Sequence, residues 1–205
     1  MPNILSFFPR KVTPMGANKN TTINPEKIKQ FLFDDDYENI QKITALNHLF
    51  LTTPTLFYPG CGCDILTPLL FIEKLLPKLS EIKLHFVDEK DNFDLIKTIL
   101  DDIDIHFSEN NNTIRFYWQH LLIDLTFTQE NVFTMNLPEF HIYFERAFRI
   151  MKDADQTYER RIYNQLSKKG LLISDSGFQN CQLQQIPIQK ELSAYQEMIV
   201  GIKNT

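Results

Sequence analysis

Hydrophobic positions along the chain follow two spacings, and segments with one spacing alternate with segments with the other. Short apolar or alternating runs, which are typical of strands, lie between segments whose apolar residues recur every three or four positions, which is typical of helices. Because strands and helices alternate, the pattern predicts an α/β fold with a mostly parallel sheet and right-handed crossovers. The predicted strands lie in residues 55–58, 82–87, 113–118, 121–127, 140–144, 171–174, 181–188 and 195–203.

Both capping residues and the spacing of apolar residues indicate where the predicted helices begin and end. Asn24 followed by Pro25 is a good helix start, because an N-cap residue precedes proline at the first helical position. The next helix is predicted to carry its apolar side chains at Ile40, Ile43, Leu46, Leu49 and Phe50. Further helices are predicted from Pro68 to about residue 76, over 93–100, and over 153–166, the last stopped by Lys168-Lys169-Gly170.

Two pairs of strands are predicted to be antiparallel. Only Gln119 and His120 separate the third predicted strand from the fourth, which predicts a hairpin. The last two predicted strands are close enough in sequence to pair antiparallel at a sheet edge.

The N-terminal residues 1–23 are interrupted by prolines and predict an irregular arm. Phe7 and Phe8 are expected to dock this arm onto the body of the protein rather than to close over a pocket. We therefore expect residues 1–52 to form an arm and two helices that pack on the core. Residues 53–205 are expected to form one compact domain.

The stretch from Thr55 to Asp64 joins a predicted strand to a glycine turn. Gly60 and Gly62 lack a Cβ atom, so the chain can turn sharply there or let a ligand approach its backbone. A helix that begins soon afterwards directs free N–H groups and the positive end of its dipole towards the same place. This arrangement is typical of sites for nucleotide-like ligands, although two glycines alone are not specific.

Composition narrows the class of protein. Of the 205 residues, 43% are hydrophobic and 23% are charged, as expected for a soluble globular protein. A formal net charge of −5 argues against a general nucleic-acid-binding surface, which needs clustered lysine and arginine. No apolar run approaches the roughly 18 residues of a membrane span. A cytoplasmic setting is therefore expected.

The three cysteines do not form the framework of a disulfide-rich secreted domain. Cys61 and Cys63 are separated by a single residue and lack the further ligands of a structural zinc site. No metal is therefore predicted.

Taken in order, several motifs resemble the class I S-adenosylmethionine-dependent methyltransferases over about residues 50–203. The motifs are Leu56–Asp64, Phe86–Asp88, Phe140–Arg146, Lys169–Gly177 and the closing strand Tyr195–Lys203. The resemblance implies a three-layer sandwich with a mostly parallel, seven-stranded sheet and helices on both faces. The last strand of that sheet inserts antiparallel beside the fifth.

The resemblance also implies S-adenosylmethionine as the cofactor and assigns residues to it. Main-chain groups at Gly60, Cys61 and Gly62 would lie against the methionine part. Asp88, with Glu89 beside it, would accept hydrogen bonds from the ribose hydroxyls. Asn131 would hold the adenine amino group, and Val132 or Phe133 would lie against the ring. The other positions implied to contact the cofactor are Tyr58, Asp64 and Glu145.

Two positions depart from the family pattern. The family usually has a carboxylate where Tyr58 stands and a third glycine where Asp64 stands. Asp64 would partly compensate by pairing with the ammonium group of the methionine part, or it would simply cap the loop. These departures motivate an alternative function, a binding or scaffold protein that keeps the fold without catalysis.

The favoured function is a methyltransferase that acts on a small molecule, with no nucleic-acid or membrane partner predicted. The catalytic residues, the methyl acceptor and the oligomeric state stay open. A dinucleotide-binding oxidoreductase is a more distant alternative, because its fingerprint needs a third glycine where Ile65 stands.

Overall fold

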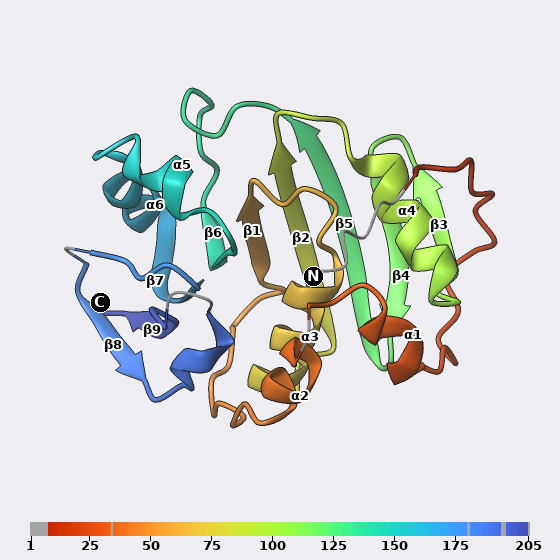
Figure 1. The fold of residues 1–205 in the computed structure, drawn as a ribbon, viewed down its shortest axis with the longest axis horizontal. Helices are drawn as coiled ribbons and strands as arrows, with labels where there is room; N and C mark the ends of the chain where they lie inside the picture. The colour runs from red at the N-terminus through yellow and green to blue at the C-terminus, as the bar shows by residue number, and fades with distance from the viewer. Residues whose placement is uncertain (1–7, 34, 180, 194–195, 205) are drawn as a thin grey trace.

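The computed structural model describes residues 8–33, 35–179, 181–193 and 196–204, and these residues form an α/β fold around one mixed sheet. Figure 1 shows the strands side by side from β3 at the right to β8 at the left. The strands are β1 (Thr55–Pro59), β2 (Glu81–Asp88), β3 (Phe107–Asn110), β4 (Thr113–Trp118), β5 (Leu121–Gln129), β6 (Phe140–Glu145), β7 (Leu166–Ser174), β8 (Leu183–Ile186) and β9 (Ile199–Lys203).

The order of the strands is β3-β4-β5-β2-β1-β6-β7-β9-β8. The five central strands, from β5 to β7, run parallel to one another, and the outer pairings are antiparallel. With β3 and β4 set aside, the last strand, β9, lies antiparallel beside β7, the fifth of the remaining seven. This insertion was predicted, as were the β4–β5 hairpin and the β8–β9 pair, and all three are confirmed.

The predicted number of seven strands is wrong, because the described sheet has nine. The predicted hairpin is extended by β3, which pairs antiparallel with β4 through a turn at Asn111. Asn111 has a φ of 53°, a left-handed conformation that asparagine tolerates better than most residues. The turn therefore adds an edge strand that the short run 107–110 did not reveal.

The helices pack on the sheet through two separate apolar clusters. Along β1, Leu56 and Tyr58 belong to the cluster that includes α3 and α4, whereas Phe57 belongs to the cluster that includes α6. Successive side chains of a strand point to opposite faces, so the two clusters lie on opposite sides of β1. The helices are α1 (Pro25–Lys29), α2 (Asp36–Gln41), α3 (Leu66–Leu75), α4 (Phe93–Asp102), α5 (Arg149–Asp153), α6 (Tyr158–Gln165) and the short 3₁₀ helix η1 (Lys190–Leu192).

The second helix is shorter than predicted. It ends at Gln41, so Leu46, Leu49 and Phe50 do not lie on it, and Leu49 is 75% exposed. The chain beyond Gln41 is held by a different bond, from the N–H of Leu46 to the carbonyl of Leu75, with a length of 2.8 Å. Helix α3 ends at Leu75, and the last carbonyl groups of a helix lack partners within it. The N–H of Leu46, in the segment after α2, satisfies one of them.

The helix predicted over residues 153–166 is also wrong in its limits. α5 ends at Asp153, α6 begins only at Tyr158, and β7 begins already at Leu166. Gly170 therefore lies inside a strand rather than after a helix. A Cβ atom on Gly170 would lie 2.9 Å from the carbonyl oxygen of His141, next to a register shift between β6 and β7. The glycine permits this close approach of the two strands.

The N-terminal arm contacts the body through polar groups and through Val12 and Ile23, which pack against the apolar core. Phe8 is 81% exposed, so its predicted docking is wrong, and Phe7 lies outside the described residues. Arg10 instead forms ion pairs with Asp101 and Asp102 at the end of α4. The N–H of Gly16 donates to the carbonyl of Phe107 on β3 at 3.0 Å, and Figure 1 shows this part of the arm beside that strand.

Helices α1 and α2 also contact the core. Ile28 of α1 and Ile40 of α2 lie in the same apolar cluster as α3, although the division into residues 1–52 and 53–205 stays a prediction. None of the helices formed by the described residues is both long and apolar enough to cross a membrane.

Candidate functional site

The candidate site is built on the loop after β1, residues 60–64, which we call the glycine loop. Gly60 and Gly62 have φ values of +60° and +53°, in the left-handed region that favours glycine. A Cβ atom on Gly60 would lie 2.6 Å from Cδ2 of Phe148, whereas one on Gly62 would meet nothing within 4 Å. Gly60 is thus required by a packed ring, and Gly62 borders open space that a ligand can enter.

Asp88, at the end of β2, is hydrogen-bonded to the glycine loop. The N–H of Gly62 donates to its Oδ2 at 2.9 Å, and the N–H of Lys90 donates to its Oδ1 at 2.9 Å. Each carboxylate oxygen has two lone pairs, so each keeps one for another donor. The structure therefore brings the predicted residues Gly62 and Asp88 together and leaves Asp88 able to bind two hydroxyl groups.

Asp64 ends the glycine loop and fixes the start of α3. The hydroxyl of Tyr58 donates to its Oδ2 at 3.0 Å, and the N–H of Thr67 donates to its Oδ1 at 3.1 Å. Because Asp64 caps this turn, α3 begins at Leu66, two residues before the predicted start at Pro68. Burial, followed by the charge of Asp64, raises the pKa of Tyr58 well above its ordinary value, so the phenol stays a donor.

The next strand, β5, brings Asn131 and Val132 to the same edge of the sheet. Asp88 of β2 is paired in register with Gln129 of β5, so the residues that follow the two strands are neighbours. The side-chain amide of Asn131 donates to Oε1 of Glu89. Val132 is buried in the cluster that contains Phe148. Glu89 and Asn131 therefore lie at the same edge as Asp88, and the binding of adenosine by these residues and Val132 stays a prediction.

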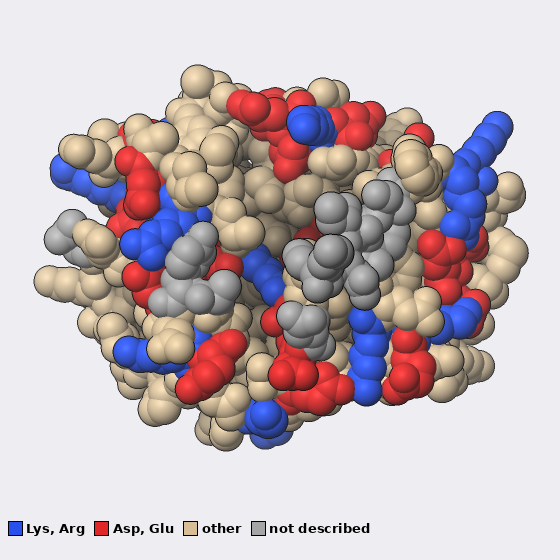
Figure 2. Space-filling model, in the orientation of Figure 1, with Lys and Arg blue, Asp and Glu red and all other residues tan. Residues whose placement is uncertain are grey.

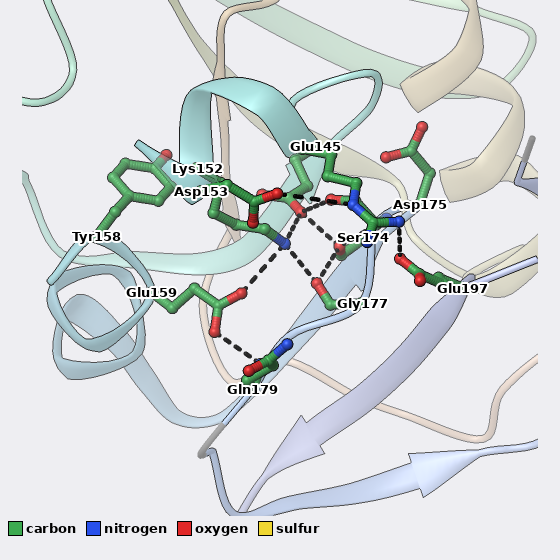
Figure 3. A network of polar contacts seen from close by, with 12 residues as sticks. Glu145, Lys152, Asp153, Tyr158, Glu159, Ser174, Asp175, Gly177, Gln179 and Glu197 are labelled. Atoms are coloured by element: carbon green, nitrogen blue, oxygen red, sulfur yellow. Dashed lines mark hydrogen bonds and ion pairs between the residues drawn. The ribbon is translucent and has the colours of Figure 1, made fainter. Parts of the chain in front are cut away.

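Glu145 makes its hydrogen bonds in a separate buried network (Figure 3). Lys152 Nζ lies 2.7 Å from its Oε1, and the hydroxyl of Tyr143 donates to its Oε2 at 2.6 Å. The hydroxyls of Ser174 and Ser176 also donate to Oε1. The carboxylate is therefore bound by four side chains, and none of these bonds reaches the glycine loop.

The cysteines of the glycine loop are held as thiols. Burial, followed by the charges of Asp88 and Asp64, raises the pKa of Cys61 well above its ordinary value. Burial and Asp64 raise the pKa of Cys63 as well. No group of three or more potential metal ligands occurs among the described residues.

Arg146 is a site residue that the sequence did not single out. It follows β6, and its guanidinium donates to Thr67 Oγ1 at 2.9 Å and to a carboxylate oxygen of Asp36. The only feature of the sequence that could have pointed to Arg146 is that it is a cation directly after a predicted buried strand. Its partner Asp36 is 110 residues away in the chain, so the pair could not be inferred without the fold.

The face of the molecule that carries the arm is hollowed near its centre (Figure 2). Acidic side chains line the upper rim of the hollow, and basic atoms are visible in its depth. The candidate site itself offers the carboxylates of Asp64 and Asp88 for hydroxyl or ammonium groups.

Comparisons with known proteins are distant. No family model and no curated protein matches the chain. It is similar to the solved structure of YcgJ from Bacillus subtilis, with 15% identity over 74% of this chain and 50% of that one and a TM-score of 0.39. The chain therefore spans about half the length of YcgJ.

Two further solved structures are of proteins described by an activity. One, from Methanococcus maripaludis, is provisionally described as an S-adenosyl-L-methionine-dependent methyltransferase; it shares 12% identity over 83% of both chains, with a TM-score of 0.46. The other is a methyltransferase from Geobacter sulfurreducens in complex with S-adenosyl-L-homocysteine, with 8% identity over 76% of this chain and 49% of that one and a TM-score of 0.39. By its strand order, the chain has the fold expected of the class I S-adenosylmethionine-dependent methyltransferases.

Proposed function

We propose that the protein is an S-adenosylmethionine-dependent methyltransferase with a small-molecule acceptor. The observation that carries the proposal is the hydrogen bond from the N–H of Gly62 to Asp88 Oδ2. It joins the turn after β1 to the acidic end of β2, at the edge where the central parallel strands end. Ligands of open α/β sheets bind at this edge, outside the carboxyl ends of the strands.

The residues present fit the two ends of this cofactor. Asp88 keeps one lone pair on each oxygen, which suits the two adjacent ribose hydroxyls. The open space beside Gly62 allows the methionine part to lie against the backbone. Asn131 and Val132, beside the end of β2, would hold the adenine. Asp64 would bind the ammonium group, since Tyr58 and the start of α3 hold its carboxylate in place.

When bound, the cofactor supplies an activated methyl group, and the protein contributes mainly position and exclusion of water. The buried ring of Phe148 against Gly60 and the buried network around Glu145 keep the segment after β6 in place beside the glycine loop. A contact of Glu145 with the cofactor stays a prediction from the family resemblance. No residue is assigned to proton transfer.

Isothermal titration with S-adenosylhomocysteine tests the proposal. We expect binding to the wild type and a loss of affinity of about tenfold or more in Asp88→Asn, because hydrogen bonds to a charged group contribute roughly 1.5–3 kcal/mol. Asp91→Asn is the matched control, since it lies in the same acidic turn and keeps an oxygen for the N–H of Phe93. Absence of binding at millimolar ligand would reject the proposal.

The departures at Tyr58 and Asp64 support a second candidate, a binding protein on the same fold that does not catalyse transfer. Incubation with S-adenosylmethionine labelled in its methyl group and a mixture of small metabolites separates the two candidates. Labelled product that requires the intact chain supports the enzyme, whereas tight cofactor binding without product supports the binding protein. Titration with NAD⁺ in the same buffer covers the oxidoreductase alternative.

A further inference from the structure

A cavity of about 500 Å³ lies beside α5, outside the carboxyl end of β7, and none of the described residues that line it is assigned to the cofactor. Its walls come from α5, from residues 155–159, which lead into α6, and from the segments around Gly177 and Glu197. The volume is within the range of small-molecule sites, about 300–1,000 Å³. The side chains of the lining are charged or polar, so the cavity does not suit an apolar ligand.

Lys152 is the most deeply buried charged residue of the cavity wall, with a side chain that is 4% exposed. Its Nζ lies 2.7 Å from Oε1 of Glu145 and 3.2 Å from Oε1 of Glu159. It also donates to the carbonyl of Gly177, and Figure 3 shows the amino group between these three acceptors. Because an ammonium group has three N–H donors, the protein itself satisfies all of them. The buried cation of the wall is therefore not available to an anionic ligand.

Glu159 is held in place at the same wall. Its Oε1 pairs with Lys152, and its Oε2 accepts a hydrogen bond of 2.6 Å from the main-chain N–H of Gln179. The pair of Lys152 with Glu145 behind it is costly, because two buried charges lose water and their attraction repays that loss only in part. Buried networks of this kind keep the side chains of a binding site in position. The pair therefore serves the cavity wall by fixing the carboxylate of Glu159.

The lining of the cavity has more negative than positive charges. Four carboxylates and two cations line it, which leaves an excess of two negative charges: Asp153, Asp155, Glu159 and Glu197 against Arg149 and Lys152. Behind the lining, the charge of Glu145 and that of Arg161, which lies 3.9 Å from Asp155, offset each other. Neither Oδ1 of Asp153 nor Oε1 of Glu197 accepts a hydrogen bond from another described residue. The cavity thus offers hydrogen-bond acceptors and negative charge.

We propose that this cavity is a second small-molecule site, which binds an aliphatic amine with two ammonium groups. Two positive charges match the excess of two negative charges in the lining. Each ammonium group supplies three donors, which suit the carboxylate oxygens that accept no bond within the protein. The site is independent of the cofactor, since it shares no residue with the glycine loop or with Asp88.

A purely structural role of these charges is the competing explanation. Arg149 pairs with Glu197 at 2.8 Å, and this pair ties α5 to the segment before β9. If the charges only held these segments together, a diamine would bind no better than an uncharged or anionic molecule of the same length. 1,4-Diaminobutane, butane-1,4-diol and succinate make this comparison, because they share a four-carbon chain and differ in charge.

Isothermal titration of the three molecules at about 0.15 M salt, where attraction between distant exposed charges is screened, tests the inference. We expect 1,4-diaminobutane to bind and the other two molecules not to bind. Glu197→Gln should weaken the binding of the diamine about tenfold or more, because it removes the charge of one carboxylate but keeps an oxygen for Arg149. Asp153→Asn should weaken it in the same direction. Glu109→Gln is the matched control, since it removes the same charge at β3, where Glu109 pairs with Lys97, and should leave the affinity unchanged.

Three outcomes would overturn the inference. They are no binding of the diamine at millimolar concentration, binding of butane-1,4-diol as tight as that of the diamine, and equal losses in Glu197→Gln and Glu109→Gln. None of them depends on S-adenosylhomocysteine, so the methyltransferase proposal is tested separately. The side chain of Asp153 is 68% exposed, so Asp153→Asn provides a folded variant if Glu197→Gln does not fold.

Discussion

The hydroxyl of Tyr58 donates a hydrogen bond of 3.0 Å to Oδ2 of Asp64. Tyr58 stands where the methyltransferase family usually has a carboxylate, and Asp64 stands where it usually has a glycine. The two residues that differ from the family pattern are therefore bonded to each other, and the tyrosine positions a carboxylate that comes six residues later. The glycine loop therefore still holds a negative charge, provided by a different residue.

Tyr58→Phe should lower the free energy of unfolding by about 0.5–1.5 kcal/mol, the usual net contribution of one hydrogen bond. The ring is 2% exposed and keeps its packing in the variant, so only the donor is lost. Urea denaturation measures the change. Tyr163→Phe removes a hydroxyl that donates to the carbonyl of Gln182 at an exposed position and serves as the control. Equal stability of Tyr58→Phe and the wild type would mean that the bond does not fix Asp64.

Gly60→Ala should destabilise the protein more than Gly62→Ala. Both glycines have positive φ, which costs an alanine about 1–2 kcal/mol. Only at Gly60 would the new methyl group also collide with the ring of Phe148. Thermal denaturation of the two variants measures the difference, and Phe148→Leu in the Gly60→Ala background should recover part of it. Equal losses at the two glycines would show that Phe148 does not constrain the loop.

Lys152→Met should destabilise the protein by roughly 3–5 kcal/mol. The side chain of Lys152 is 4% exposed and its partner Glu145 is fully buried, so the variant leaves an uncompensated carboxylate inside the protein. The second substitution Glu145→Gln removes that charge and should restore part of the stability. Guanidinium denaturation of the single and double variants gives the coupling between the two residues.

Lys97→Met is the control for the buried pair. Lys97 pairs with Asp94 and Glu109 nearer to the surface, where an ion pair contributes about 0–1 kcal/mol. Similar losses for Lys97→Met and Lys152→Met would contradict the special cost assigned to the buried carboxylate.

Asp175 should make stability fall as the pH rises. Burial raises its pKa above the ordinary value of 3.8, and its Oδ1 is buried without a hydrogen-bond partner among the described residues. The folded protein therefore holds this proton more tightly than the unfolded chain does. Raising the pH from 3.8 towards the folded pKa deprotonates the unfolded chain first, which lowers the free energy of unfolding by at most about 1.4 kcal/mol per pH unit.

Asp175→Asn removes the titration and keeps an oxygen for the N–H of Ala147, which donates to Oδ2 at 2.8 Å in the wild type. Urea denaturation at several pH values between 4 and 7 should show the wild type losing stability relative to this variant. Parallel pH profiles of the two proteins would contradict the raised pKa.

Much of the fold followed from local patterns in the sequence. The run around β1, the hairpin of β4 and β5 and the closing pair of β8 and β9 were placed correctly, because each combines a clear apolar pattern with a nearby turn. Helix α2 was predicted too long, since Leu46 and Phe50 keep the spacing of a helix although Leu46 is bonded to Leu75 instead. The periodicity does not reveal which partner the backbone finds.

The candidate site was predicted as far as it depends on neighbouring strands. The position of Asp88 could be predicted because it lies at the end of a predicted strand. Its approach to Gly62 is a consequence of the parallel pairing of β1 and β2. The bond between Tyr58 and Asp64 was not predicted, although both residues were named. Arg146 and the network around Glu145 were missed, because their partners come from segments that are brought together only by the folded sheet.

The order of strands in the sheet has a consequence for how the protein acquires its structure. β3, β4 and β5 follow one another directly in the chain and pair antiparallel, whereas the bond between β1 and β6 joins residues more than 80 positions apart. Loop-closure entropy makes distant pairings slow, so the three-stranded unit should form first and the central parallel strands later. Pulse-labelling hydrogen exchange during refolding should protect the amides of β4 and β5 before those of β1 and β6; simultaneous protection would contradict this order.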